Sequence, residues 1–272
     1  MYTLSHIYIY PIKGCAGISL SEAQVLDRGL KYDRRWMLVD ADGRFISQRS
    51  HPQLALIETS ISSDYLHVSY LGDQHKIPLA ATNGEQRDVI VWDDTLNAYV
   101  ADTNDSRWFS EVLNMEVTLV SMQQDSRRPV DPRYAVSHEE EVSFADGYPF
   151  LIIGRASMDL LNEKLVREPL LIDRFRPNLV FDGGKAHEED TWQSFSVGSV
   201  DFYGVKPCAR CQVTTIDQQT GVSGKEPLKS LARYRRKGNK ILFGQNCLMK
   251  KSGVIKVGDR IEVTRRGKPA IV

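Results

Sequence analysis

The chain has 272 residues, of which 42% are hydrophobic and 26% are charged, a composition typical of globular proteins and not of disordered chains. Its 35 basic residues equal its 35 acidic residues, so the overall charge indicates neither a nucleic-acid partner nor an anionic membrane. We expect no signal peptide and no membrane-spanning helix, because no apolar run approaches the roughly 20 residues that such a helix needs.

Short strand-like runs dominate the first half of the chain. The pair Asp42-Gly43 lies between the apolar runs 36–39 and 44–47 and predicts a hairpin. One helix is expected after the capping residues 102–104, because apolar residues recur at helical spacing over 108–113. Strands this closely spaced favour a barrel or sandwich over βαβ units. Further strands are expected at residues 5–10, 54–60, 66–70, 89–92, 98–101 and 117–121.

A polar stretch over residues 123–141 separates the two halves of the sequence. We expect a solvated surface loop there and place a domain boundary before it, which gives domains at residues 1–122 and 123–272. Helices are expected at 157–166 and from Pro227 to about 234. Strands are expected at 148–153, 179–181, 212–216 and 242–246. A hairpin around Gly198 is expected at 195–202, and closing strands over 254–263 turn at Gly258-Asp259. The predicted fold is therefore mainly β with a few helices (α+β).

The segment Cys208-Ala209-Arg210-Cys211 contains two of the four cysteines, with a cation between them. Soft sulfur beside positive charge can bind a metal or support redox chemistry. Structural zinc would need about four ligands, but Cys15 and Cys247 are isolated and the histidines show no paired spacing. Dithiol exchange would place the pair at a helix start, whereas β-prone residues 212–216 follow it. A buried, inert cysteine pair stays open on this evidence.

Three basic segments can be interpreted in two ways. In Arg174-Phe175-Arg176-Pro177-Asn178, the two arginines could bind a phosphate through paired N–H groups, or they could form salt bridges in a surface loop. The same alternatives apply to Tyr10–Gly14 and to Asp33–Trp36. Neither common glycine-rich phosphate loop is present.

The order and spacing of these segments resemble the MOSC-domain family, of the type that also carries a MOSC N-terminal β-barrel domain. The chain is similar in this respect to the mitochondrial amidoxime-reducing components and their bacterial counterparts. The resemblance runs nearly end to end, and it rests on residues 10–15, 33–39, 144–146, 149–151, 174–178, 208–211, 214–215, 226–228, 243–246 and 253–259.

The resemblance implies an N-terminal β-barrel-like domain followed by a MOSC β-barrel domain that binds the molybdenum cofactor. Cys211 would supply a thiolate to the metal, and Arg210 would favour that thiolate. The residues that would hold the phosphate-bearing pterin are Lys13, Arg34, Arg176 and Asn178, with Arg210 and Asp146 close by. Gly14 and Ala209 stand where relatives often have serine, so two hydroxyl contacts to the cofactor could be missing.

The resemblance also implies a reductase of small N-hydroxylated substrates such as amidoximes, hydroxylamines and N-hydroxylated bases. Asp146 is the candidate for acid–base catalysis beside Cys211. We expect a separate electron-transfer protein or reductase as partner, because no iron–sulfur, flavin or nicotinamide motif is found. Four cysteines do not indicate a disulfide framework, so a cytoplasmic location is expected. The alternatives are a non-catalytic carrier of cofactor or sulfur, and a structural β-protein.

Overall fold

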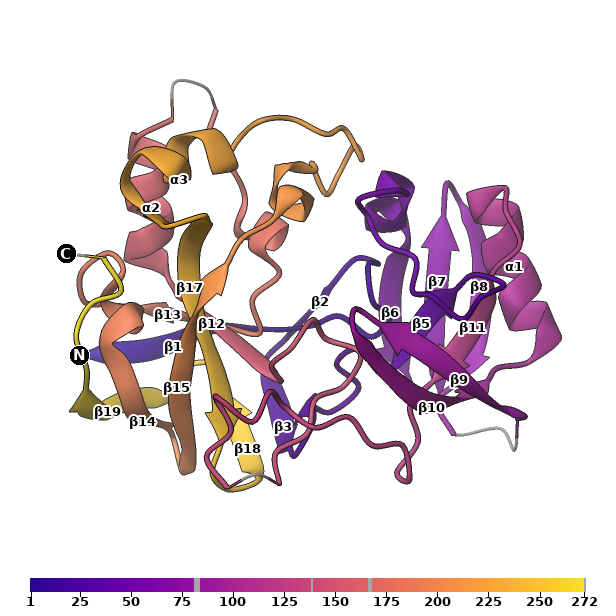
Figure 1. Cartoon of the computed structure of the whole chain (residues 1–272), viewed down its shortest axis with the longest axis horizontal. Helices are drawn as coiled ribbons and strands as arrows, with labels where there is room; N and C mark the ends of the chain where they lie inside the picture. The colour runs from indigo at the N-terminus through magenta and orange to yellow at the C-terminus, as the bar shows by residue number, and fades with distance from the viewer. Residues whose placement is uncertain (81–83, 138, 166–167, 272) are drawn as a thin grey trace.

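Two lobes lie side by side along the long axis of the molecule (Figure 1). The computed structural model describes residues 1–80, 84–137, 139–165 and 168–271. One lobe is built around a closed β-barrel and the other around a half-barrel with one helix. The prediction of a mainly β protein with barrel domains and a few helices is confirmed.

Within the described residues, seven strands form the barrel, and it closes because the strand 150–154 pairs with strands on both of its sides. In order around the barrel, the strands are β12 (Phe150–Gly154), β13 (Leu179–Asp182), β1 (Tyr2–Ile9), β19 (Arg260–Arg266), β14 (Trp192–Val197), β15 (Val200–Ala209) and β17 (Lys240–Met249). Only β12 and β13 run parallel to each other. The first strand of the chain thus completes a barrel whose other strands come from the second half.

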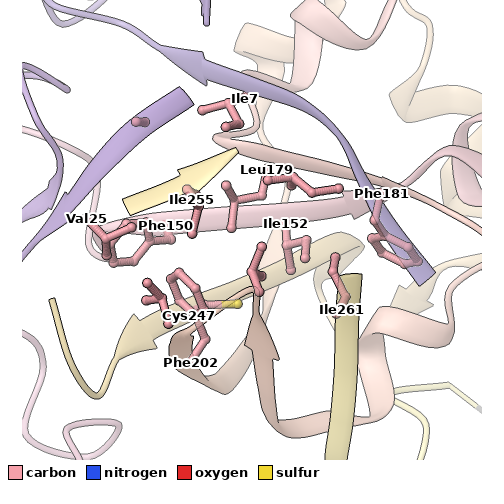
Figure 2. Packing of buried hydrophobic residues seen from close by; sticks show 14 of the residues in the cluster. Ile7, Val25, Phe150, Ile152, Leu179, Phe181, Phe202, Cys247, Ile255 and Ile261 are labelled. Carbon is pink, nitrogen blue, oxygen red and sulfur yellow. The ribbon is translucent and has the colours of Figure 1, made fainter. Parts of the chain in front are cut away.

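The barrel interior is filled by aliphatic and aromatic side chains from nearly every strand (Figure 2). In β1, a register shift between Leu4 and His6 lets Leu4 and Ile7 both face inward although they are three residues apart. Cys247 lies fully buried in this core, and burial raises the pKa of its thiol. Cys15 is equally buried in the other lobe. Both isolated cysteines therefore act as small apolar core residues.

The half-barrel lobe consists of two sheets and a helix that share one core. The first sheet contains β5 (Trp36–Val39), β11 (Thr118–Ser121), β10 (Asp94–Val100) and β9 (Gln86–Val91). The second contains β6 (Glu58–Ser62), β7 (Tyr65–Tyr70) and β8 (Asp73–Pro78). Helix α1 (Thr103–Leu113) begins where the Asp102 side chain accepts a hydrogen bond from Asn104 N, and it buries Trp108 and Phe109.

Smaller elements complete the two lobes and the segments between them. They are β2 (Ile18–Leu20), β3 (Glu22–Leu26), β4 (Gly29–Leu30), β16 (Arg236–Lys237) and β18 (Gly253–Lys256), with 3₁₀ turns η1 (Pro52–Leu56), η2 (Ile172–Phe175), η3 (Glu188–Thr191) and η4 (Gln212–Thr215). Helices α2 (Arg155–Glu163) and α3 (Leu228–Tyr234) cover the same end of the barrel lobe (Figure 1). No helix in the described part of the chain has the length and apolar character needed to cross a membrane.

Most predicted elements occur, but two predictions are wrong in part. Residues 212–216, expected as a strand, form the turn η4, and residues 54–60 divide between η1 and β6. The helix expected at 157–166 begins earlier, at Arg155, and Val166 lies outside the described residues. The hairpin at Asp42-Gly43 is confirmed, because Gly43 adopts φ +76° and Val39 bridges Phe45 beyond the turn.

The polar stretch 123–141 is irregular, as predicted, but its charges are not all solvated. Arg128 is only 2% exposed. Its guanidinium donates to Asp94 Oδ2 (2.9 Å), Ser143 O (2.8 Å) and Asp146 O (3.1 Å). Arg128 therefore fixes the loop that leads into β12. The division into domains 1–122 and 123–272 stays a prediction, and β1 lies in the barrel with strands of the second range.

Arg235, which follows α3, and Asp190 of η3 form a buried ion pair. Arg235 Nη2 donates to Asp190 Oδ2 at 2.5 Å, and Arg235 Nε donates to Leu242 O at 3.0 Å. Both side chains are almost fully buried. Loss of one partner would leave the other charge in a poorly solvated site, which is far more costly than losing a surface pair.

We predict that Arg235→Met lowers the free energy of unfolding by about 3–5 kcal/mol, because Asp190 keeps its burial but loses its partner. Urea titration of the purified variant measures this change. The matched control is Arg236→Met at the exposed neighbour, which should change stability by less than about 0.5 kcal/mol. Equal effects of the two substitutions would contradict the importance of the pair.

Candidate functional site

One cleft, lined by residues of both lobes, contains every predicted site residue. These residues are Lys13, Arg34, Asp146, Arg176, Asn178, Arg210 and Cys211. They come from five segments: the loop after β1, the turn before β5, the loop before β12, the segment between η2 and β13, and the segment between β15 and η4. The fold thus brings together charges that lie far apart in the sequence.

Cys211 stands between the end of β15 and the start of η4, and it is partly exposed in the cleft. The turn that follows is closed by threonine hydroxyls: Thr214 Oγ1 donates to Cys211 O at 2.9 Å, and Thr215 Oγ1 donates to Gln212 O at 2.8 Å. Such local side-chain bonds offer the backbone an alternative to a strand. They explain why this β-branched segment turns beside the cysteine.

Arg210 contacts the other cysteine of the loop. Its Nη1 donates to Cys208 Sγ at 2.9 Å, and its Nη2 donates to Phe175 O at 2.5 Å. The resemblance implies that Arg210 acts on the Cys211 thiolate, whereas in the structure its guanidinium is bonded to Cys208. Arg210 Nε is buried and has no hydrogen-bond partner among the described residues. The guanidinium thus positions the loop and still has one donor free for a ligand.

A tyrosine ring organises the cationic wall of the cleft. The guanidinium carbons of Arg34 and Arg176 each lie 4.2 Å from the centre of the Tyr10 ring, a distance typical of cation–π contacts. Tyr10 is almost fully buried, and its hydroxyl donates to Pro177 O at 3.1 Å. Arg34 Nη2 donates to Arg176 O at 3.1 Å. Tyr10 therefore holds both arginines in fixed positions.

The two arginines differ in how their charge is balanced. Arg34 Nη1 binds both oxygens of the buried Asp33 carboxylate, at 2.7 and 2.8 Å. Burial, and then the charge of Arg34, lower the pKa of Arg176 to about 10. Arg176 Nη2 is buried, and the described part of the chain offers it no hydrogen-bond partner. An unpaired buried cation favours an anionic ligand that can accept its hydrogen bond.

Asn178 has a structural role in addition to its place in the cleft wall. Leu151 N donates to Asn178 Oδ1 at 3.2 Å, and Asn178 Nδ2 donates to Tyr8 O at 3.2 Å. The side chain is thus bonded on both sides to the backbone of the barrel, and it is nearly fully buried. Asn178 positions the segment that carries Arg176, and its predicted contact with a cofactor stays a prediction.

Lys13 and Asp146 form an ion pair across the cleft. Lys13 Nζ lies 2.6 Å from Asp146 Oδ1 and also donates to Phe144 O at 2.8 Å. The enclosing cleft walls oppose ionisation of Asp146, but Lys13 outweighs them and holds its pKa well below the usual range. The side chain is 71% exposed, so solvent also supports the charged form. Asp146 is therefore a weak base at neutral pH.

Sequence reasoning missed the residues that the half-barrel lobe contributes. Trp92 Nε1 donates to Asp146 Oδ1 at 3.2 Å, which joins the two lobes over the cleft. Phe45 and Arg49 pack against the Trp92 ring, with centre distances of 4.9 and 4.4 Å. Gln48 Nε2 donates to Gly14 O at 2.6 Å. No spacing or motif marks these residues, because their contacts arise only where the lobes meet.

The backbone conformation at Gly14 favours glycine over serine. It adopts φ +93°, in the left-handed region where a side chain is strained, and an added Cβ would lie 3.1 Å from Leu54 Cδ1. This position therefore uses a backbone shape that favours glycine, and its carbonyl is occupied by Gln48.

Two protein-family models match successive parts of the chain. The model of the MOSC N-terminal beta barrel domain matches residues 1–116, and that of the MOSC domain matches residues 139–262. The chain is 32% identical to mitochondrial amidoxime-reducing component 1 of Mus musculus, over 95% of this chain and 81% of that protein. The chain belongs to the MOSC-domain family. It is also 31% identical to component 1 of Homo sapiens, over 95% of this chain and 82% of that protein.

A second group of MOSC relatives is longer. The chain is 32% identical to molybdenum cofactor sulfurase of Oryza sativa subsp. japonica, over 89% of this chain but only 32% of that protein. The name of this second relative refers to the molybdenum cofactor. The unpaired donors of Arg176 and Arg210, together with the partly exposed Cys211 thiol, fit a phosphate-bearing cofactor with a thiophilic metal.

We predict that Arg176→Gln weakens binding of pyrophosphate to cofactor-free protein at least about tenfold, because it removes a charge-assisted hydrogen bond. The shift of the unfolding midpoint with pyrophosphate concentration measures this affinity.

The matched control for Arg176 is Arg174, which lines the same cleft. Arg174 Nη2 is already bound to Asp217 Oδ2 at 2.5 Å, and its Nη1 donates to Thr215 O at 3.3 Å. Arg174→Gln should therefore keep pyrophosphate affinity within about twofold, because its charge is already compensated. If both variants bound pyrophosphate as the wild type does, the anion site would lie elsewhere.

Proposed function

We propose that this MOSC protein is a molybdenum-cofactor-dependent oxidoreductase that reduces N-hydroxylated compounds, with Cys211 as the metal ligand. The observation that carries the proposal is the meeting of Cys211 with the incompletely paired arginines Arg176 and Arg210 in one cleft. Similarity to proteins named amidoxime-reducing components, over 95% of the chain, supports the reaction class. Amidoximes, hydroxylamines and N-hydroxylated bases are the proposed substrates.

Each part of the cofactor would have a matching group in the cleft. Arg176 and Arg210, whose donors are incompletely paired, would supply positive charge for the phosphate. Lys13 and Arg34 would add charge that Asp146 and Asp33 partly offset. Cys211 supplies a soft sulfur ligand. When bound, the cofactor supplies two-electron oxygen-atom transfer.

The overall reaction converts R–NHOH, two electrons and two protons into R–NH₂ and water. Asp146, which the sequence suggested for acid–base catalysis, stays ionised beside Lys13 and is unsuited to hold a proton at neutral pH. Tyr148 also lines the cleft, and its buried hydroxyl has no partner among the described residues. Burial raises the pKa of Tyr148, which makes this hydroxyl a weaker acid than that of an ordinary tyrosine. We assign Tyr148 Oη the role of a hydrogen-bond donor in the cleft and not that of a proton source.

The two electrons come, in this proposal, from a separate electron-transfer protein or reductase. All four cysteines are free thiols. Reduced thiols are typical of the cytoplasm, and we place the protein there.

We predict that Cys211→Ala, made in a host that produces the cofactor, loses at least about 90% of its bound molybdenum, because the metal loses its thiolate ligand. Elemental analysis and a viologen-coupled assay with benzamidoxime measure molybdenum content and turnover. Cys208→Ala is the matched control, because it removes a neighbouring thiol that is bonded to Arg210. It should retain most of the molybdenum, and equal losses in both variants would argue for a structural cysteine pair.

A carrier of cofactor or sulfur is the second candidate, favoured by the similarity to one third of a molybdenum cofactor sulfurase. The two functions differ in turnover. If the wild type is a carrier, it should contain stoichiometric molybdenum yet reduce none of the three substrate classes with reduced viologen. Sustained turnover of any of them would rule out a purely carrying role.

A further inference from the structure

A basic face surrounds helix α3 and the hairpin that follows it. It consists of Lys225, Lys229, Arg233, Arg236, Lys237 and Lys240, all of which are exposed. None of the six forms an ion pair with any described residue. Residues 225–240 contain one carboxylate, Glu226, which accepts a hydrogen bond from Ser230 N at 2.9 Å. Because the whole chain is electrically neutral, this face is a strong local excess of positive charge.

The basic face lies directly over the cysteine loop. Arg210 N donates to Ile241 O at 2.7 Å, one residue after Lys240. Cys208, Ile241 and Tyr234 of α3 all pack against the same cluster of buried side chains, which includes Leu231 and Phe243. On the other side, Gly224 N donates to Thr215 O at 2.9 Å, just before Lys225. Figure 1 shows α3 and the preceding loop at the end of the barrel lobe where β17 begins.

We propose that this basic face is the docking surface for an acidic electron-transfer protein, an inference that rests on the proposed reductase function. Unneutralised surface charge accelerates encounter with a partner of opposite charge and orients it. Because α3 packs against η4, docking here would bring the partner's redox centre close to the segment that carries Cys211. Two one-electron transfers would supply the electrons consumed with two protons in each turnover.

An electron carrier fits this face better than a nucleic acid does. Single-stranded nucleic acids usually stack their bases on exposed aromatic side chains, and the only aromatic residue within 225–240 is the half-buried Tyr234. Val222, three residues before Lys225 in the sequence, is an exposed large apolar residue, which suits a small protein contact.

The test compares two pairs of charge reversals that change the net charge equally. Lys229→Glu with Arg233→Glu alters the basic face, and Lys250→Glu with Lys251→Glu alters exposed, unpaired lysines beyond the other end of β17. The ten residues of β17 separate the two sites by about 30 Å, at roughly 3.3 Å per residue. A second reversal, Lys237→Glu with Lys240→Glu, tests the face independently of helix α3.

Each holoprotein reduces benzamidoxime with one of two electron donors, an acidic plant-type [2Fe–2S] ferredoxin reduced by dithionite or reduced methyl viologen. Reversals on the basic face should lower kcat/KM for ferredoxin at least about tenfold at low ionic strength and weaken its salt dependence. The control pair should stay within about twofold of wild type, since remote surface charges contribute little. Rates with methyl viologen should not fall in any variant.

Equal ferredoxin kinetics in the basic-face and control variants would overturn the docking proposal. If the wild type reduced no substrate even with methyl viologen, the proposed function would fail. The affinity of ferredoxin for the holoprotein, measured by titration, would then test the docking proposal by itself. A tenfold weaker affinity for ferredoxin in the basic-face variants, but not in the control variant, would support the docking proposal. Equal affinities in all variants would overturn the proposal. Tighter binding of a DNA oligonucleotide or of phosphatidylserine vesicles than of ferredoxin would also overturn it.

Discussion

The candidate site depends on one constraint, the crowding of like charges around the Tyr10 ring. Arg34 and Arg176 both lie 4.2 Å from this ring, and of the two only Arg34 is bound to the buried carboxylate of Asp33. Burial and Arg34 together disfavour the charged form of Arg176, which is why its pKa falls to about 10. An anion in the cleft would reverse this effect, because it would pair with the free Nη2 group and restore the charged state. The folded chain is thus already arranged for a negatively charged ligand.

The barrel supplies the rigidity that this crowding requires. Tyr10 follows β1 directly, and its backbone N–H donates to Asp33 Oδ1 at 2.8 Å while Arg34 N donates to Tyr10 O at 2.8 Å. The same carboxylate therefore neutralises Arg34 and fixes the end of β1. Asn178 ties the Arg176 segment to β1 and to β12. Because β1 and β12 are strands of the closed barrel, the backbone segments that carry the two arginines are both bonded to the barrel or to the residue directly after β1.

Patterns in the sequence are sufficient to predict those elements that are determined by residues close together in the chain. The Asp42-Gly43 turn and the cap at Asp102 were predicted because one or two residues determine them. The turn after Cys211 was missed, because β-branched Thr214 and Thr215 also carry hydroxyls that bond to preceding carbonyls. The seven site residues came from the resemblance, and it could not indicate that Arg210 would bond to Cys208 or that Lys13 would neutralise Asp146. Those pairings depend on the packing of distant segments.

The contribution of the half-barrel lobe follows from the same reasoning. A cleft built only on the barrel would lack the side chains of Phe45, Gln48 and Trp92 that line it. Trp92 binds the Asp146 carboxylate, and the Trp92 ring is itself held between Phe45 and Arg49. Gln48 joins the lobe to the Gly14 carbonyl and, at 3.0 Å, to Gln218 beyond η4. These contacts reach both sides of the cleft, so the second lobe determines how closed the cleft is. A more enclosed cleft strengthens the charge interactions of the groups that line it. For this reason, chemistry at Cys211 that depends on the neighbouring charges would require both lobes.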